Sequence, residues 1–175
     1  MNDLLELSES IVSFADDTVI LINGTNWNES QNKANSILNK SYEWFNDNFL
    51  SLNIKKSCYI TFALSHKMLP DDFDIKITDE NTIVTLDRVE NTKYLGITID
   101  QHMRRDVHIS NLLKRLRFVV FLFHKLKYIL NYNQLKIIYY ASFHSLMSYG
   151  ILGWGGAYNN CVNIIQRLQN KLLKI

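Results

Sequence analysis

Two adjacent aspartates, Asp16 and Asp17, are the residues of this sequence whose type and position most directly suggest chemistry. They stand between two apolar runs in the stretch SIVSFADDTVILIN, residues 10–23. Two like charges this close repel each other unless a cation relieves the repulsion. Mg²⁺ prefers carboxylate oxygens, and two such ions about 4 Å apart are the usual arrangement for in-line phosphoryl transfer. The pair therefore suggests a divalent-metal site.

The flanking runs, 10–14 and 18–23, are rich in β-branched residues and predict a β-hairpin with a tight connection over Ala15, Asp16 and Asp17. Adjacent residues on a flat strand point to opposite faces, so the bend of a hairpin tip is needed to bring both carboxylates to one side. A solvated turn is the alternative, because Asp is a favoured turn residue. Apolar strands on both sides favour a hairpin within a larger sheet, its acidic end facing a cleft.

The remaining front part of the chain predicts one helix and several strands. Apolar residues three and four apart predict the helix at about 29–49, with Asn28 as its N-cap. Residues 65–81, with the acids around Pro70, predict a surface loop or a short peripheral hairpin. Strands are expected at 57–64, at 81–89 and at 93–100, the last containing Gly96, where the backbone either bulges or approaches another group.

From about residue 104 the apolar spacing becomes helical. We expect helices at about 104–128, 133–146 and 160–175, with a turn around Trp154 in the glycine-rich segment 150–156. The predicted fold class is therefore α+β, with a β-rich domain at 1–100 followed by an all-helical domain at 101–175.

The charge of the chain is divided between these two parts. Residues 1–100 carry 8 Lys and Arg against 16 Asp and Glu, whereas residues 101–175 carry 11 Lys and Arg against one acid, Asp106. Such a division suggests a front part that holds cations and a back part that approaches a polyanion. Alternatively, the two parts neutralise each other across an internal interface.

The first helix of the back part carries much of this positive charge. Its basic residues are Arg104, Arg105, Lys114, Arg115, Arg117, Lys125 and Lys127. An apolar stripe runs between them, made of Ile109, Leu112, Leu113, Leu116, Val119, Val120, Phe123 and Leu126. The stripe is typical of a helix that packs on a core. The basic residues indicate either a surface that follows nucleic-acid phosphates or a solvated face without a partner.

Other residue types suggest no second site. Cys58 and Cys161 stand apart from each other and indicate reduced, buried thiols. His102 and His108 do not have a metal-ligand spacing, and His124 and His144 fall in or beside apolar stripes, which favours core positions. No signal peptide and no membrane-spanning run are visible, so we expect an intracellular protein, cytoplasmic or nuclear and not secreted.

Several segments together resemble the reverse transcriptases of non-LTR (LINE-type) retrotransposons. FADDTVILIN is similar to their catalytic hairpin, and KYLGITID resembles the hairpin that grips the primer terminus. WFNDNFLSLNIKKSCYITF matches their helix and the segment that follows it, and LKIIYYASFHSLMSYGILGWGGAY resembles a later helical segment. The segments follow in the same order over nearly all 175 residues, although Phe14 replaces the commoner Tyr and Ser57 replaces Thr. The resemblance implies a partial palm at 1–100 and a thumb at 101–175.

The resemblance also assigns roles to residues of this chain. Asp16 and Asp17 would bind the metal ions, which are Mg²⁺ or, as an alternative, Mn²⁺. Lys56 would lie near the phosphates of the incoming nucleotide and assist the leaving pyrophosphate. Tyr94, Leu95 and Gly96 would form the primer grip. The residues that would contact an RNA template and a DNA primer are Arg104, Arg105, Lys114, Arg115 and Arg117. Oligomeric state is not indicated by any of these motifs.

In this family a further metal-binding aspartate and the fingers domain lie upstream of the FADD box. We therefore expect metal binding only if that carboxylate is supplied, and no polymerase activity from this chain alone. Three alternatives stay open: a non-catalytic RNA- or DNA-binding remnant or co-opted module, a product of a decayed element, and a two-metal nuclease. The nuclease would need a further carboxylate, for which Asp100 is the candidate.

Overall fold

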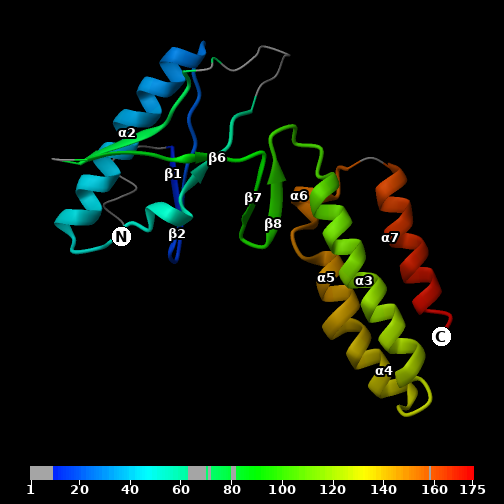
Figure 1. Ribbon diagram of the computed structural model, residues 1–175. Coiled ribbons are helices and arrows are strands. Elements are labelled where there is room, and N and C mark those ends of the chain that lie inside the picture. The colour runs from blue at the N-terminus through cyan, green and yellow to red at the C-terminus, as the bar shows by residue number, and fades with distance from the viewer. Residues whose placement is uncertain (1–9, 63–69, 71, 80–81, 158) are drawn as a thin grey trace. The chain divides into compact units, whose positions relative to one another are not determined.

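The computed structural model describes residues 10–62, 70, 72–79, 82–157 and 159–175 (Figure 1). Helices and two-stranded sheets alternate along these ranges, which confirms the α+β class. The chain divides into two compact units, residues 1–90 and 91–175. The assignment of a palm to 1–100 and of a thumb to 101–175 stays a prediction. None of the helices in the described ranges combines the length and the apolar character needed to cross a bilayer.

The first unit contains one long helix and three strand pairs. Its elements are β1 (Ile11–Phe14), β2 (Asp17–Ile20), α2 (Trp27–Asp47), η1 (Ile54–Lys56), β3 (Cys58–Tyr59), β4 (Lys76–Asp79), β5 (Thr82–Thr85) and β6 (Asp87–Arg88). The pairs β1–β2 and β4–β5 are antiparallel, and β3–β6 is parallel. Of the segment 65–81, predicted as a loop or a short hairpin, residues 65–69, 71 and 80–81 lie outside the described residues. Its strand β4 pairs with β5, which lies in the next predicted segment. The strand expected at 57–64 is only β3 within the described residues, and the strand expected at 81–89 is divided between β5 and β6.

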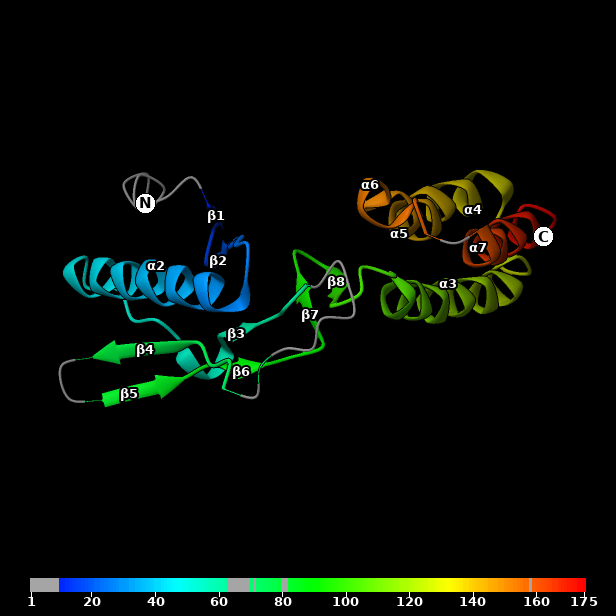
Figure 2. The ribbon, with the colours of Figure 1, turned by 90° about the horizontal axis from the view of Figure 1, so that it is seen from above.

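Helix α2 packs against β4, as Figure 2 shows for these two elements of the first unit. The buried side chains are Phe73, Ile75, Ile77 and Leu86, and Trp27, Ala34, Leu38 and Tyr42 of α2 pack against them. Asn35 Oδ1 accepts the Lys76 N–H at 2.9 Å, and Asn39 Oδ1 accepts the Thr78 N–H at 2.8 Å. Four residues of a helix span about 6 Å, and two residues of a strand span about 6.8 Å. Because these two lengths are similar, asparagines four residues apart on α2 can bond strand residues two apart on β4.

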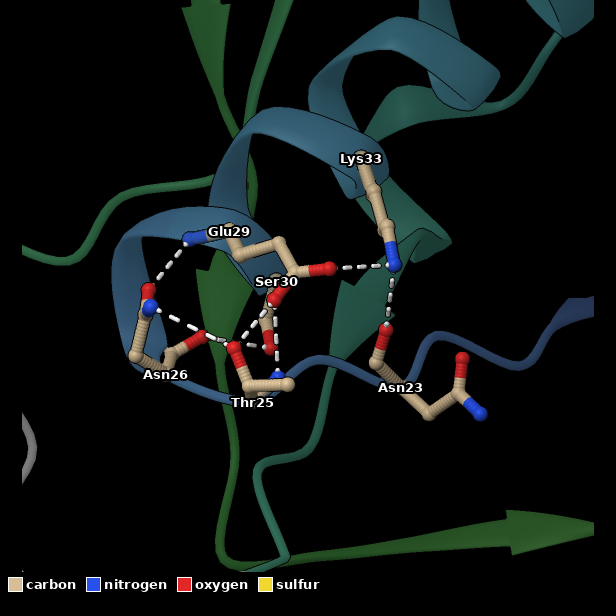
Figure 3. Close-up of polar contacts among 6 residues, drawn as sticks. All are labelled: Asn23, Thr25, Asn26, Glu29, Ser30 and Lys33. Atoms are coloured by element: carbon tan, nitrogen blue, oxygen red, sulfur yellow. Dashed lines mark hydrogen bonds and ion pairs between the residues drawn. The ribbon is translucent and has the colours of Figure 1, made fainter.

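The first turn of α2 is stabilised by a polar network (Figure 3). The N-cap is Asn26, whose side chain accepts the Glu29 N–H at 2.8 Å, so the predicted cap at Asn28 is wrong by two residues. Glu29 bonds Lys33 at 2.6 Å and accepts the Thr25 hydroxyl at 2.6 Å and the Thr25 N–H at 2.9 Å. These contacts, the one with Lys33 first, lower the pKa of Glu29 from 4.5 to about 2.

The second unit is a β-hairpin followed by helices. Its elements are β7 (Asn91–Tyr94), β8 (Ile97–Asp100), α3 (Asp106–Leu126), α4 (Tyr132–Ile138), the π-helical turn η2 (Tyr139–His144), α5 (Ser145–Ser148), α6 (Ile151–Trp154) and α7 (Asn159–Leu172). The predicted helices are confirmed with shifted ends. The turn expected around Trp154 is instead the short helix α6. The backbone N–H of Trp154 donates to the Gly150 carbonyl, and the Trp154 side chain is buried.

One core holds the helices of this unit together. Leu116 and Phe143 are fully buried, and the other apolar residues predicted for the stripe of α3 surround Leu116, Leu126 excepted. Gln169 of α7 donates to the Tyr139 hydroxyl at 2.8 Å, which ties α7 to η2. Asn131 and Gln134 form a capping box that begins α4. The packing leaves the opposite face of α3 in solvent.

The network around Glu29 predicts a pH dependence of stability. Because the pKa of Glu29 is lower in the folded state, its contribution is fully present above about pH 4.5 and is lost as the pH falls through about 2. We expect urea unfolding followed by circular dichroism to show a smaller decline in stability between these pH values for Glu29→Gln than for the wild type. Glu43→Gln, an exposed change on the same helix, is the control. Equal declines for both variants would contradict the assignment.

Candidate polymerase site

The two aspartates lie at the tip of the β1–β2 hairpin. Phe14 pairs with Asp17, so the connection is the two-residue loop Ala15–Asp16, and Asp17 is the first residue of β2. The predicted three-residue connection is therefore one residue too long. Ala15 has a φ of 54°, while Asp16 does not have a positive φ, the pattern of a type II′ turn. Both carboxylates are exposed. The hairpin thus leaves both carboxylates in solvent at its tip. Among the described residues β1 pairs with β2 alone, so the prediction of a hairpin within a larger sheet, its acidic end facing a cleft, is wrong.

The donor set at this tip suits a hard cation but is not a complete cage. Mg²⁺ binds carboxylate oxygens in near-octahedral geometry, and the two aspartates offer such oxygens. One residue pair further from the tip, the Ser13 and Thr18 hydroxyls lie 3.2 Å apart across the strands. Within the described ranges no group of three or more His, Cys, Asp or Glu residues could hold a metal ion. Asp16 and Asp17 therefore fit two ligand positions, and further oxygens must come from another source.

Lys56 lies on a different element of the same unit. It ends the turn η1, where the Asn53 carbonyl accepts the N–H groups of Lys56 and Ser57 and the Ser57 hydroxyl. This turn leaves the Lys56 side chain exposed. Among the interactions of the described residues, none joins Lys56 to either aspartate. The structure supports Lys56 as an accessible cation and leaves its role near a nucleotide a prediction.

The segment KYLGITID is a hairpin and not the continuous strand that its β propensity predicts. Tyr94 pairs with Ile97, and Leu95 and Gly96 form the two-residue loop with φ values of 44° and 81°. Positive φ at both residues is the pattern of a type I′ turn, which matches the twist of a hairpin. The alternative of a close approach at Gly96 is confirmed. A Cβ atom there would lie 3.0 Å from Cε1 of Tyr149.

Tyr149 is a residue that the sequence reasoning missed. Its hydroxyl donates to the Leu95 carbonyl at 2.6 Å, and its own carbonyl accepts the Trp154 indole N–H at 3.0 Å. The next residue, Gly150, has a φ of 62°, and a Cβ atom there would overlap the Ile97 side chain. The sequence signal that could have indicated this contact is the glycine next to Tyr149 in the segment SYG, residues 148–150. These contacts hold the Leu95–Gly96 turn against the start of α6.

Asp100 connects the hairpin to α3. Its carboxylate accepts the backbone N–H groups of His102, Arg104 and Arg105 at 2.8 to 3.1 Å. Burial alone would raise the pKa of Asp100, but the three hydrogen bonds outweigh it and lower the pKa below its ordinary value. Arg105 also donates from Nε to the Gly153 carbonyl at 2.7 Å. Asp100 is thus engaged with the backbone at the start of α3, which weakens its candidacy as a nuclease ligand.

The predicted basic residues of α3 lie on its exposed side. Lys114, Arg115 and Arg117 are exposed, as is Arg104 before the helix, whereas Arg105 is half-buried. Both ion pairs found among the described residues belong to the first unit, so none of these cations has an acidic partner there. The exposed side also carries Phe118 and Phe121, which the sequence reasoning did not single out. The exposed side of α3 is therefore both basic and aromatic.

Two predictions about single residues need correction, those for Cys58 and His124. Cys58 is exposed and not buried, because β3 is short and its first residue faces solvent. His124 is exposed, since it lies beside the buried stripe of α3 and not in it. His108, in contrast, is buried and its Nδ1 accepts the Thr98 N–H at 3.3 Å, and burial followed by the charge of Arg115 lowers its pKa.

The contact between Gly96 and Tyr149 makes a prediction for stability. Gly96→Ala places a Cβ atom at a positive φ and 3.0 Å from the tyrosine ring, so we expect a loss of about 1–2 kcal/mol in the free energy of unfolding. Gly156→Ala is the matched control, because nothing lies within 4 Å of its Cβ position and its φ is not positive. Urea unfolding of both variants measures the difference. Equal stabilities would contradict the described turn.

Comparisons with known proteins agree with the motifs at this site. No family model and no solved structure matches the chain. It is 30% identical over 108 residues, 59% of its length, to the retrovirus-related Pol polyprotein from type-1 retrotransposable element R1 of Nasonia vitripennis. It is 25% identical over 170 residues, 94% of its length, to a probable RNA-directed DNA polymerase from transposon BS of Drosophila melanogaster. The chain spans 32% and 18% of the lengths of these relatives. These matches support the resemblance to a fragment of the reverse transcriptase of non-LTR (LINE-type) retrotransposons, to which the chain corresponds over part of the length.

Proposed function

We propose that the chain is a segment of an RNA-directed DNA polymerase, with a palm-like part at 1–100 and a thumb-like part at 101–175. One observation carries the proposal: a tight turn exposes Asp16 and Asp17 together at a hairpin tip. This tip occurs in a chain that is similar over 94% of its length to a relative named as an RNA-directed DNA polymerase. Such an enzyme acts on nucleic acid inside the cell, in the cytoplasm or the nucleus.

Asp16 and Asp17 would hold Mg²⁺, or Mn²⁺ in its place. When bound, the metal would activate the primer hydroxyl and neutralise the charge on the reacting phosphates. The role of the two aspartates is to fix oxygen ligands at an exposed tip that nucleic acid can reach. Mg²⁺ is commonly bound by one or two carboxylates together with substrate phosphates. With a hybrid bound, its phosphates would therefore complete the metal site without the further carboxylate expected from the sequence, whereas polymerase activity would still require that carboxylate. Lys56, an exposed cation of the same unit, would offset charge on the leaving pyrophosphate.

The Leu95–Gly96 turn would contact the primer end. Its rigidity fits that role, because the hydrogen bond from Tyr149 fixes the Leu95 carbonyl. The Tyr149 ring covers the side of Gly96 on which a Cβ atom would lie. A primer would therefore approach the turn from the opposite side. Tyr94, on the strand before the turn, is half-buried and would support it.

The second unit would bind the nucleic-acid backbone. Residues 91–175 carry 12 Lys and Arg against two acids, and one of these acids, Asp100, is engaged in hydrogen bonds to the backbone. The predicted contacts are Arg104, Arg105, Lys114, Arg115 and Arg117. Nε of Arg105 donates a hydrogen bond to the Gly153 carbonyl, so only the terminal guanidinium nitrogens of Arg105 would contact a phosphate. Such contacts give salt-dependent affinity that does not depend on sequence.

A non-catalytic RNA- or DNA-binding module is the second candidate. The observation that favours it is the lack of an acidic partner for the basic residues of α3 among the described residues, whereas the metal tip has only two carboxylates. The two candidates differ in one testable respect. A module would bind nucleic acid without regard to the aspartates, whereas a polymerase segment would bind a primer–template hybrid more tightly when metal joins the two aspartates to it.

We expect the 175-residue chain to bind an RNA–DNA hybrid with a log affinity that falls linearly with log salt. Fluorescence anisotropy in a salt series, with and without millimolar Mg²⁺, measures this. Arg117→Gln should lower the slope by about one. Mg²⁺ should strengthen binding to the wild type more than to Asp16→Asn, with Asp47→Asn, an exposed change at the end of α2, as control.

Two outcomes would contradict these proposals. Absence of salt-dependent binding to the hybrid would overturn both candidate functions. Binding whose response to Mg²⁺ is the same in the wild type and in Asp16→Asn would overturn the polymerase segment and favour the non-catalytic module.

A further inference from the structure

A groove lies between α3 and α7 on the surface of the second unit. It is lined by Arg117, Val120, Phe121 and His124 of α3 and by Leu168 and Lys171 of α7, and its volume is about 260 Å³. The two helices run side by side in Figure 1 and contact each other. No acidic side chain lines the groove. It therefore combines an apolar floor with a cationic rim.

The helical spacing explains this combination. Arg117, Phe121 and His124 are four and three residues apart, so they follow one edge of α3 next to its buried stripe. Leu168 and Lys171 are three residues apart on α7 in the same way. Val120 is buried and Leu168 half-buried, whereas the cationic side chains are exposed. The edge where the core meets solvent is thus the place where apolar and cationic groups come together.

Phe121 is the unusual residue of this groove. Its side chain is 53% exposed, although burial of a phenylalanine ring is strongly favourable. The Lys125 ammonium lies 5.0 Å from the ring centroid. This cation–π contact places a further positive charge beside the groove. It does not bury the Phe121 ring against apolar side chains. An exposed aromatic ring among cations is the arrangement that proteins use to bind single-stranded nucleic acid, because bases stack on the ring and phosphates contact the cations.

Other occupants fit these residues less well. A partner helix would have to bury Arg117 and Lys171 without an acidic group of this groove to pair with them, which is costly. A duplex would offer phosphates to the cations, but its bases are stacked on one another and would leave Phe121 unused. The volume lies just below the usual range of small-ligand pockets, about 300–1,000 Å³, so the groove is too small for a bulky ligand.

We propose that the α3–α7 groove is a binding site for single-stranded nucleic acid, in which one base stacks on Phe121 and adjacent phosphates contact Arg117, His124 and Lys171. This inference rests on the proposed nucleic-acid function of the second unit and adds to it a site that shares Arg117 with the proposed hybrid contacts. It explains why an exposed aromatic ring lies among the basic residues of α3, since binding of a hybrid does not require such a ring.

The test compares matched variants of the 175-residue chain. Phe121→Ala and Phe121→Leu remove the ring, and Phe118→Ala removes a ring of similar exposure, 61%, that does not line the groove. Lys171→Gln removes a groove cation, and Lys174→Gln removes a cation near it in sequence that does not line the groove. The probes are a labelled oligothymidylate, an abasic strand of the same length and an RNA–DNA hybrid, with affinities from anisotropy and folding checked by circular dichroism.

We expect both Phe121 variants to bind oligothymidylate about tenfold more weakly than the wild type, with Phe118→Ala unchanged. The abasic strand should bind more weakly than oligothymidylate and should not distinguish Phe121 from Phe118. Lys171→Gln should lower the salt slope for oligothymidylate by about 0.7, and Lys174→Gln should not. Affinity for the hybrid should be the same in the wild type and the Phe121 variants.

Equal effects of the Phe121 and Phe118 changes on oligothymidylate would overturn the groove site while leaving the proposed function intact, provided that the hybrid still binds. The groove site would also be overturned if the abasic strand bound as tightly as oligothymidylate, or if groove variants changed only self-association in sedimentation. Absence of binding to all three probes would overturn the proposed function together with the groove site.

Discussion

The burial of one face of α3 is the interaction on which the second unit depends. Leu116 of α3 and Phe143 of η2 are fully buried, and Ile165 and Leu172 of α7 pack into the same core. Because the buried stripe occupies one side of the helix, the polar and basic residues between its members must face solvent. At the start of α3, hydrogen bonds between this end of the helix and Thr98 and Asp100 hold the β7–β8 hairpin, and along its edge α3 forms the groove with α7. The surfaces proposed for nucleic acid are therefore consequences of how the core is built.

The acidic tip of the first unit depends on a different constraint. A two-residue turn places Asp16 in the loop and Asp17 on the first strand position, and it requires a positive φ at Ala15. A positive φ costs an alanine about 1–3 kcal/mol, which glycine would avoid. Repulsion between the two carboxylates adds to this cost. Both costs are tolerable in solvent, and a bound divalent ion would remove the second.

The sequence predicted those features that follow from local pattern. The stripe of α3, the hairpin around FADD and the α+β class are all visible as spacing of apolar residues. The ends of helices were less predictable. Asn26 and Asn28 are the same residue type, and the contacts of Glu29 with Thr25 and Lys33, which accompany the cap at Asn26, are not visible in the sequence pattern. The type I′ turn was hidden in KYLGITID, since only Gly96 signals a positive φ and Leu95 does not. Tyr149 and Phe121 were unpredictable for another reason: their roles come from contacts between elements far apart in the sequence.

The central claim is that the Asp16–Asp17 tip binds metal next to a bound primer–template. Fe²⁺ in place of Mg²⁺ reduces added hydrogen peroxide to hydroxide and a hydroxyl radical, which cleaves nucleic acid close to the ion. The claim can therefore be tested with an end-labelled RNA–DNA hybrid and no turnover. We predict cleavage centred near the primer terminus, suppressed by excess Mg²⁺ and lost in the Asp16→Asn/Asp17→Asn variant. Uniform cleavage that both substitutions leave unchanged would contradict the claim.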